Sequence, residues 1–346
     1  MIPFLIMAVV LWGVGAVTHA PKPARWAMIG ILYVAVILAL AVLPEAHPMR
    51  TTLGGSLGEW LLLGGFAAVI MAYRFGLRAL RARVAPVADS EAEGPFRPAE
   101  LDRYMRHILL REIGGPGQKK LKEAKVLVVG AGGLGAPILQ YLAASGVGTI
   151  GVIDDDVVEA SNLQRQVIHT DARLGVPKVF SAAEAMRAQN PFIEVRPYNR
   201  RFDESCVALI REYDLVLDGS DNFDTRYLVN ALCVTEKTPL IAAAITQWEG
   251  QISTYNAAKN GPCYQCVFPE RPAEGMVPTC AEAGVAAPLP GILGTMMAME
   301  ALKEITGAGQ GLIGRLLIHD ALYTETRVIT VKKREDCPIC GRNSHG

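Results

Sequence analysis

Residues 130–135, which read GAGGLG, have the residue types of a turn that holds phosphate groups. They follow an apolar, β-branched run at 126–129 that predicts a buried strand, and an apolar helical pattern follows them. Glycine lets the backbone approach a phosphate, and a helix N-terminus directs N–H groups and partial positive charge toward it. A second predicted strand, 149–153, ends in three aspartates, of which Asp154 is placed to bind ribose hydroxyls. An ordinary glycine-rich turn would not explain this acid. The pattern predicts a nucleotide site and leaves open whether the nucleotide is a dinucleotide or ATP.

Polar residues follow the end of the second strand. The segment 159–166 is too polar for a core and lies where open α/β sheets bind ligands. Pro177 is suited to the first position of a helix that runs to about residue 189, so Lys178 projects from the helix N-terminus. A cation there is unfavourable against the helix dipole unless an anion is bound. This placement indicates a binding role for Lys178.

Two acids and an amide follow another predicted strand at 214–217. Asp218 and Asp221, with Asn222 beside them, stand at the carboxyl end of that strand. Carboxylates that face a phosphate site suit Mg²⁺, which takes few protein ligands. Asp and Asn are equally typical of a turn that caps a helix, so both interpretations stay open.

Four of the seven cysteines form two Cys-x-x-Cys pairs, Cys263 with Cys266 and Cys337 with Cys340. Each pair places two thiolates on a tight turn, and together they supply four sulfurs for a tetrahedral structural zinc site. In an intracellular protein that uses nucleotides, such pairs favour metal over disulfides. Cys280 lies in a Gly/Pro-rich segment, where a cysteine is either a nucleophile or inert.

A parallel sheet must bring these residues together. Further strands are expected at 194–199, 214–217 and 240–244, and helices at 100–113, 177–189, 204–212, 225–236 and 290–306. Residues 114–117 are expected to end the first helix, because they read GGPG. The methionines of the last helix, Met296, Met297 and Met299, and the helical cysteines, Cys206 and Cys233, are interpreted as packing residues. The alternation of strands and helices predicts a Rossmann-like, doubly wound α/β domain at 99–346 with a zinc knuckle.

The composition separates the first part of the chain from the rest. With 34 basic and 34 acidic residues, the 346-residue chain carries no overall signal for binding nucleic acid. Its mean hydropathy of +0.24 is high for a soluble α/β enzyme, and the excess lies in the first 80 residues. Residues 84–98 are rich in Pro, Ala and acids and lack periodicity, so they are expected to be a linker.

Three apolar runs in residues 1–83 predict an all-helical membrane segment with about three spans. The runs at 2–20 and 26–43 approach the roughly 20 residues that a helix needs to cross a bilayer. The third, 60–73, becomes long enough if it begins near residue 53 and Arg74 reaches the interface. A cleaved signal peptide is the competing interpretation of the first run, but the basic region that precedes such peptides is missing.

The basic residues set the expected orientation. Lys22 and Arg25 fill the first loop, and four arginines follow the third run: Arg74, Arg78, Arg81 and Arg83. Basic loops stay in the cytoplasm, so three spans place the nucleotide domain in the cytoplasm, attached to the cell inner membrane and in contact with its lipid. With only two spans, by the same reasoning, this domain would be exported away from ATP.

Over residues 100–340 the sequence resembles the MoeB/ThiF/HesA family, the prokaryotic relatives of ubiquitin-activating enzymes. The matching stretches are RYMRHILL, VLVVGAGGLG, VIDDDVVEASNLQRQ, GVPKV, LVLDGSDN, CYQC, TCAEAGV and CPIC, in the family's order. The combination of SNLQR, GAGGLG and the paired cysteine knuckles is specific. The sequence is most similar to the molybdopterin-synthase adenylyltransferase branch, which belongs to molybdenum cofactor biosynthesis.

The resemblance implies an enzyme that uses ATP and Mg²⁺ to adenylate the C-terminal glycine of a small ubiquitin-like sulfur carrier ending in Gly-Gly. It implies that Arg165 and Lys178 neutralise the triphosphate and that Asp221 holds Mg²⁺. Arg106 matches an arginine that reaches the site of the other protomer in a homodimer, and Cys280 matches a cysteine that is catalytic only in some members. The four knuckle cysteines match zinc ligands. The implied nucleotide-binding residues are Gly130, Gly132, Gly133, Gly135, Asp154, Asp156, Ser161, Asn162, Leu163, Gln164, Arg165, Lys178, Asp221 and Asn222.

Three other functions compete with this one. A sulfur-carrier adenylyltransferase of thiamine or another sulfur pathway would use similar residues. A nicotinamide-dependent oxidoreductase explains the glycine turn and Asp154 but gives no role to Arg165, Lys178, Asp221 or the knuckles. A noncatalytic membrane adaptor would keep the cations without turnover. The usual family member lacks the apolar segment, and no rhodanese-like domain follows the knuckles, so sulfur for the carrier is expected from elsewhere.

Overall fold

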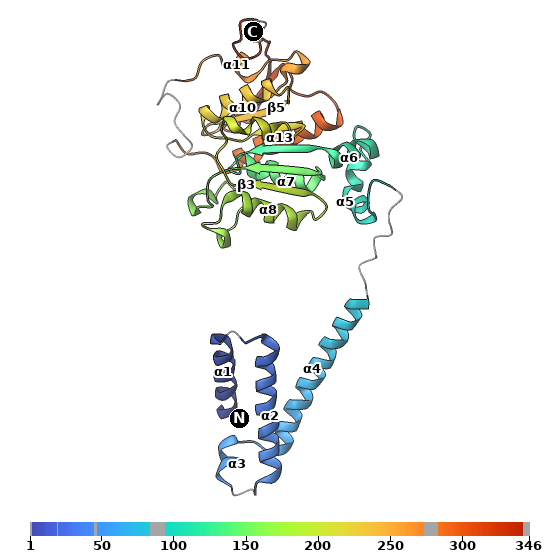
Figure 1. The fold of residues 1–346 in the computed structure, drawn as a ribbon, viewed down its shortest axis with the longest axis vertical. Helices are drawn as coiled ribbons and strands as arrows, with labels where there is room; N and C mark the ends of the chain where they lie inside the picture. The colour runs from blue at the N-terminus through green and yellow to red at the C-terminus, as the bar shows by residue number, and fades with distance from the viewer. Residues whose placement is uncertain (1, 19, 45–46, 84–93, 273–282, 342–346) are drawn as a thin grey trace. The chain divides into compact units, whose positions relative to one another are not determined.

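The computed structural model describes residues 2–18, 20–44, 47–83, 94–272 and 283–341. The chain divides into two compact units, residues 1–91 and 92–346 (Figure 1). We call them the N-terminal unit and the catalytic unit, and each is described by itself.

The described residues of the N-terminal unit form four helices and no strand: α1 (Ile2–Val17), α2 (Lys22–Val42), α3 (Pro48–Leu53) and α4 (Leu57–Arg83). α1 and α2 pack side by side, and α4 packs on α2 (Figure 1). A small apolar cluster holds α2 and α4 together, with Trp60 and Leu40 almost fully buried. The ring of Phe4 lies 5.1 Å from that of Trp60 and brings α1 into the same cluster. Most other apolar side chains of this unit are exposed, including Val9, Val10, Leu62 and Phe66.

Two helices of this unit are long and apolar enough to cross a membrane: Ala24–Val42, with a mean hydropathy of 2.2, and Leu57–Leu77, with 1.6. Only 11% and 6% of them are buried, so they are not core helices of a globular domain. The first predicted run forms only a short apolar helix, Pro3–Val17. At 1.5 Å per residue its length is about 23 Å, less than the roughly 30 Å hydrocarbon core. Two of the three expected runs therefore form helices long enough to cross a membrane, and α4 begins at Leu57 rather than near residue 53.

The catalytic unit is built on one eight-stranded mixed sheet. Its strands are β1 (Lys125–Val129), β2 (Thr149–Ile153), β3 (Glu194–Tyr198), β4 (Leu215–Asp218), β5 (Leu240–Ile245), β6 (Glu249–Tyr255), β7 (Arg315–Asp320) and β8 (Glu325–Thr330). They lie in the order β3-β2-β1-β4-β5-β6-β7-β8. The first five are parallel, and β6, β7 and β8 continue the sheet in antiparallel pairs. This is the mixed α/β, Rossmann-like fold that the sequence predicts.

Two helical layers cover this sheet. The helices of the unit are α5 (Pro98–Ile108), α6 (Gly114–Glu123), α7 (Gly135–Ser145), α8 (Lys178–Gln189), α9 (Val207–Ile210), α10 (Phe223–Thr235), α11 (Tyr264–Val267) and α13 (Pro288–Thr306), with short 3₁₀ turns η1 (Ala160–Asn162), η2 (Asp171–Arg173), η3 (Glu204–Cys206) and η4 (Ala257–Lys259). Val126 and Val128 of β1 pack into the core under α7, α8 and α13, whereas Leu127 and Val129 pack toward α9 and α10. Figure 1 shows α8 and α10 on opposite sides of the sheet. Alternate side chains of a strand point to opposite faces, so the apolar run of β1 fills both cores.

Two local expectations are wrong. GGPG was expected to end a helix that runs to residue 113, but α5 already ends at Ile108, and residues 114–123 form a helix of their own, α6. Tertiary packing overrides the poor propensity: Leu121 is fully buried, and the buried Gln118 donates a hydrogen bond to the carbonyl of Ser145. In α13, Met297 is fully buried as expected, but Met299 is 56% exposed and does not pack in the core.

Candidate functional site

The residues that the sequence indicates for nucleotide binding follow the carboxyl ends of β1, β2 and β4. From β1 the chain proceeds to β2 and β3 on one side and returns to β4 on the other. The strand order therefore reverses between β1 and β4. Open α/β sheets bind ligands outside the carboxyl ends of the strands at such a reversal.

The glycine turn after β1 is tightly constrained. Gly130 has a φ of 91°, which favours glycine, and a Cβ atom added at Gly135 would lie 2.0 Å from the carbonyl oxygen of Gly130. Within the described part of the chain, the backbone N–H groups of Gly132, Gly133 and Leu134 donate no hydrogen bond. They precede the first turn of α7, so they are available to an anion.

Substituting Gly135 with alanine is expected to destabilise the catalytic unit strongly. The added methyl group would meet backbone rather than a movable side chain, at the upper end of the roughly 1–3 kcal/mol that overpacking costs. Gly132→Ala is the matched control, because its Cβ atom meets only the Gln166 amide nitrogen at 3.6 Å. Thermal unfolding of the two variants measures the difference, and equal melting temperatures would contradict this account of the turn.

Asp154, at the end of β2, is tied to the glycine turn. One carboxylate oxygen accepts a hydrogen bond from the N–H of Ala131 at 2.7 Å, and the other accepts one from the N–H of Asp156 at 2.8 Å. Burial raises the pKa of Asp154 above its usual value, although the Ala131 N–H and the nearby Lys178 act in the opposite direction. The carboxylate fixes the turn against β2 and is only half-buried, so its side chain stays accessible to a ligand.

Lys178 and Arg165 approach this edge of the sheet from the segment between β2 and α8. The Lys178 ammonium lies 2.7 Å from the Asp156 carboxylate; the lysine side chain is 6% exposed and the aspartate side chain 67%. Arg165 donates to the carbonyl of Ser161 and to the side chain of Asn162, and its stem lies 3.7 Å from where a Cβ of Gly133 would be. The segment 161–165 therefore folds back beside the glycine turn. Of its other residues, Leu163 is half-buried and Gln164 is exposed.

His169 is a buried residue of this region that the sequence did not indicate. Its Nε2 lies 3.0 Å from the carbonyl oxygen of Ala131, and its Nδ1 lies 2.8 Å from the hydroxyl of Ser181 on α8. A carbonyl only accepts, so Nε2 carries the proton and Nδ1 accepts from Ser181. The segment around His169 has no periodicity that would mark it as buried, so only the folded structure identifies it.

The stability of the catalytic unit is expected to fall when the pH drops below about 6.5. Burial lowers the pKa of His169 below its usual value of 6.5, and the cations of Lys178 and Arg173 lower it further, while the Ala131 carbonyl and Asp154 oppose the shift. In this pH range the unfolded chain binds a proton that the folded chain does not, so acid favours unfolding. Chemical denaturation from pH 7.5 to 5.5 measures this loss, which should be smaller in His169→Gln. An equal loss in both proteins would contradict the assignment.

The polar residues at and after the end of β4 have different roles. Asn222 caps α10, since its side chain accepts a hydrogen bond from the N–H of Thr225. Asp218 is fully buried; one oxygen accepts from the N–H of Ser220, and the other has no hydrogen-bond partner in the described part of the chain. Asp221 is exposed at the same edge of the sheet. The capping interpretation is therefore correct for Asn222, and Asp221 is the carboxylate accessible to a cation.

The two Cys-x-x-Cys pairs meet in one cluster, although 74 residues separate them in sequence. The sulfurs of Cys263 and Cys337 are 3.6 Å apart, those of Cys266 and Cys340 are 3.4 Å apart, and those of Cys263 and Cys266 are 3.9 Å apart. Four thiolates about 2.3 Å from a tetrahedral Zn²⁺ would lie about 3.8 Å from one another. All four residues are buried, so the donor set, its size and its burial fit a structural zinc ion.

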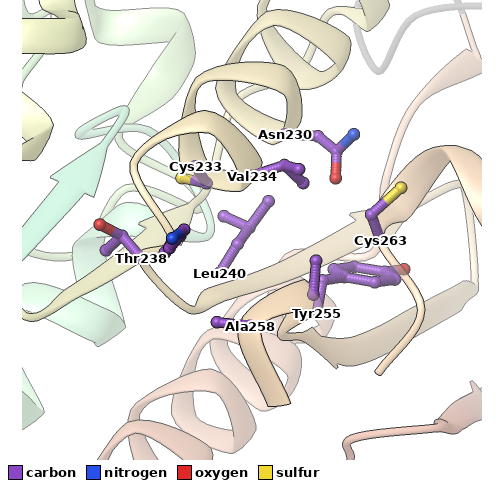
Figure 2. A pocket seen from close by; sticks show the side chains of 10 residues that line it. Asn230, Cys233, Val234, Thr238, Leu240, Tyr255, Ala258 and Cys263 are labelled. Carbon is purple, nitrogen blue, oxygen red and sulfur yellow. The ribbon is translucent and has the colours of Figure 1, made fainter. Parts of the chain in front are cut away.

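A small cavity lies beside this cluster, between α10 and β5. Figure 2 shows its lining, with Cys233 and Asn230 on α10 and Cys263 and Tyr255 across from them. Its volume of about 10 Å³ admits at most one water molecule. Cys233 and Cys206 are buried, as expected for packing residues.

Comparison with known proteins agrees with this geometry. The model of the ThiF family matches residues 104–339. The chain belongs to the ThiF family. It is 49% identical over 247 residues to the sulfur carrier protein adenylyltransferase of Thermus thermophilus, covering 70% of this chain and 91% of the relative. It is 50% identical over 243 residues to the SAMP-activating enzyme E1 of Haloferax volcanii, covering 70% and 89%.

The fold of this ThiF-family chain also occurs in a solved structure. The crystal structure of E. coli MccB with ATP superposes with a TM-score of 0.61 over 69% of this chain and 74% of that one, at 24% sequence identity. The predicted family and the prediction of an adenylyltransferase are confirmed.

Arg106 and Cys280 are the remaining candidate residues of this ThiF-family chain. Arg106, on α5, is exposed and makes no hydrogen bond or ion pair with the described residues of its own chain. Cys280 lies outside the described residues. The roles of both stay predictions.

Proposed function

We propose that this enzyme uses ATP to adenylate the C-terminal glycine of a small ubiquitin-like sulfur carrier of the molybdopterin-synthase small-subunit type. A carrier of thiamine synthesis or of another sulfur pathway is the second candidate for the same reaction. Support comes from membership of the ThiF family, since a relative is named as a sulfur carrier protein adenylyltransferase.

One structural observation carries the proposal. The unpartnered N–H groups of the glycine turn, the Arg165 guanidinium and the Lys178 ammonium gather at the carboxyl edge of β1 and β2. Such a concentration of donors suits a triphosphate better than the two phosphates of a nicotinamide dinucleotide. The Asp154 carboxylate is suited to accept hydrogen bonds from the ribose hydroxyls, as the sequence indicates.

The reaction needs these cations. An oxygen of the carrier's terminal carboxylate attacks the α-phosphorus of ATP, and the bond from that phosphorus to the oxygen shared with the β-phosphate breaks. Pyrophosphate leaves, and the carrier retains AMP as an acyl-adenylate. Repulsion between the carboxylate and the triphosphate opposes the approach, so fixed positive charge at the phosphates stabilises the transition state. We propose Asp221, which is exposed at this edge of the sheet, as the residue that would hold Mg²⁺; the ion would supply further positive charge.

We also propose that the enzyme acts as a homodimer in which Arg106 reaches the nucleotide of the partner protomer. Its exposed position on α5 leaves the guanidinium available to a second copy. The four-cysteine cluster is proposed to hold Zn²⁺ as a structural ion.

The N-terminal unit is proposed to anchor the enzyme in the cell inner membrane through α2 and α4. Two spans return the chain to the side from which it entered, so Lys22 and Arg25, in the first turn of α2, stay on the same side as Arg74, near the end of the apolar stretch of α4. The positive-inside rule makes this side the cytoplasm. The catalytic unit is therefore cytoplasmic with two spans, α2 and α4, and the expectation that two spans would export it does not apply.

Full-length protein is expected to sediment with membranes and to remain there after a high-salt or alkaline wash. The reason is the exposed apolar surface of α2 and α4, because transfer of this surface from the bilayer to water is unfavourable. A chain that begins at Ala92, the first residue of the catalytic unit, is the control and should stay in the supernatant. Recovery of uncleaved full-length protein in the supernatant would exclude the anchor.

Capture of the carrier distinguishes the candidate pathways. Immobilised enzyme incubated with cell extract and ATP should retain a small protein that ends in Gly-Gly, and its sequence identifies the pathway. Retention of a thiamine-pathway carrier alone would replace the molybdopterin assignment with the second candidate.

A further inference from the structure

We propose that His169 is a positioning residue for adenylation. It fixes the position of the glycine turn relative to the first turn of α8. The inference rests on the proposed function. The buried His169 side chain joins two elements of the site: Nε2 donates to the Ala131 carbonyl at 3.0 Å, and Nδ1 accepts from Ser181 at 2.8 Å.

Ala131 is held by both of its backbone polar groups. Its N–H donates to Asp154 at 2.7 Å, and its C=O accepts from His169. With both groups bonded, the peptide units on either side of Ala131 have little freedom to rotate. Their orientation sets the direction of the free N–H groups of Gly132 and Gly133, which follow at once in the chain.

The other side of the imidazole is attached to the element that carries Lys178. Ser181 is fully buried in the first turn of α8, three residues after Lys178, and its carbonyl accepts a hydrogen bond from Arg173 at 2.9 Å. His169 therefore links the N–H donors of the glycine turn to the lysine that stands at the start of α8. We infer that this link makes both sets of donors converge on the same phosphate oxygens during adenylyl transfer.

A matched pair of substitutions separates the two hydrogen bonds. The longer side chain introduced by His169→Gln can place an amide N–H near the position of Nε2 and keep the bond to Ala131. The shorter one introduced by His169→Asn places its amide near the position of Nδ1, so it can reach Ser181 but not Ala131. Both replacements are neutral and polar, and neither touches the nucleotide.

The test measures ATP–pyrophosphate exchange by the full chain with its carrier, together with AMP binding. The kcat of His169→Asn is expected to fall about 10- to 50-fold, because misplaced donors stabilise the transition state less. AMP affinity should be unchanged, because the ribose contact at Asp154 is kept. His169→Gln should stay within about threefold of the unsubstituted enzyme. Equal kcat values for both variants would overturn the inference, whereas absence of exchange in the unsubstituted enzyme would instead contradict the proposed function.

A measurement on the unsubstituted chain does not depend on the folding of a variant. Nitrogen NMR of ¹⁵N-histidine-labelled protein at pH 7.5 should show His169 protonated at Nε2 and not at Nδ1. Addition of ATP should shift the Nε2 resonance, because the glycine turn to which His169 is hydrogen-bonded then binds phosphate. The opposite tautomer, or a signal that ATP leaves unchanged, would overturn the inference.

Discussion

Replacing Lys178 with methionine is expected to lower the kcat of adenylation at least about 100-fold, the loss seen when one preorganised charge-stabilising donor is removed from an active site. The lysine side chain is nearly fully buried and, among the described residues, its ammonium pairs only with the exposed carboxylate of Asp156. Methionine fills similar space, and water solvates the released Asp156. The variant should therefore fold and still bind AMP, while ATP–pyrophosphate exchange measures the loss.

Lys119→Met is the matched control for this substitution. Lys119 lies on α6, and its one interaction in the part of the chain that the structure describes is an exposed ion pair with Glu123, which contributes little to stability. The rate of ATP–pyrophosphate exchange by Lys119→Met should equal that of the unsubstituted enzyme. A Lys178→Met variant with normal exchange would show that the ammonium does not stabilise the transition state. The proposed triphosphate site at the carboxyl edge of β1 and β2 would then be wrong.

Replacing Cys337 with serine is expected to release zinc and to unfold the region around α11. Structural Zn²⁺ contributes on the order of 10 kcal/mol to the folding of small domains, and loss of one thiolate removes much of that. The buried sulfur cluster has no large apolar core of its own, because only Val234, Ala257 and Ile339 pack against it among the described residues. Zinc content by atomic emission should fall from one per chain to near zero, with a large drop in melting temperature.

Cys206→Ser tests whether any buried cysteine would have the same effect. Cys206 is buried outside the cluster and accepts a hydrogen bond from Arg200 at 3.0 Å, which serine can also accept. Its zinc content should stay at one per chain. If Cys337→Ser retained zinc and stability, the four cysteines would not form a metal site.

The parallel half of the sheet could be predicted closely from the sequence, and the antiparallel half could not. The expected strand at 149–153 is β2, and the expected strand at 126–129 lies within β1. Parallel strands are buried on both faces and appear as continuous apolar runs. β8 reads ETRVIT and is exposed along its whole length, so its pairing with β7 leaves no apolar pattern to recognise.

Local parts of the candidate site were likewise predictable, and its long-range contacts were not. The glycine turn and Asp154 belong to one strand–helix–strand unit, whose spacing is visible in the sequence. The bond between His169 and Ala131 joins residues 38 positions apart, and the pairing of Lys178 with Asp156 spans 22 positions. Such contacts depend on how loops fold over the sheet edge, which neither periodicity nor propensity describes.

The most direct test of the central claim is ATP–pyrophosphate exchange by the full-length enzyme with a purified sulfur carrier. We expect exchange that depends on the carrier and disappears when the carrier's final glycine is removed, because that glycine supplies the attacking carboxylate. Carrier-dependent exchange that survives both Arg165→Ala and Lys178→Met, or no exchange with any captured Gly-Gly carrier, would contradict the account.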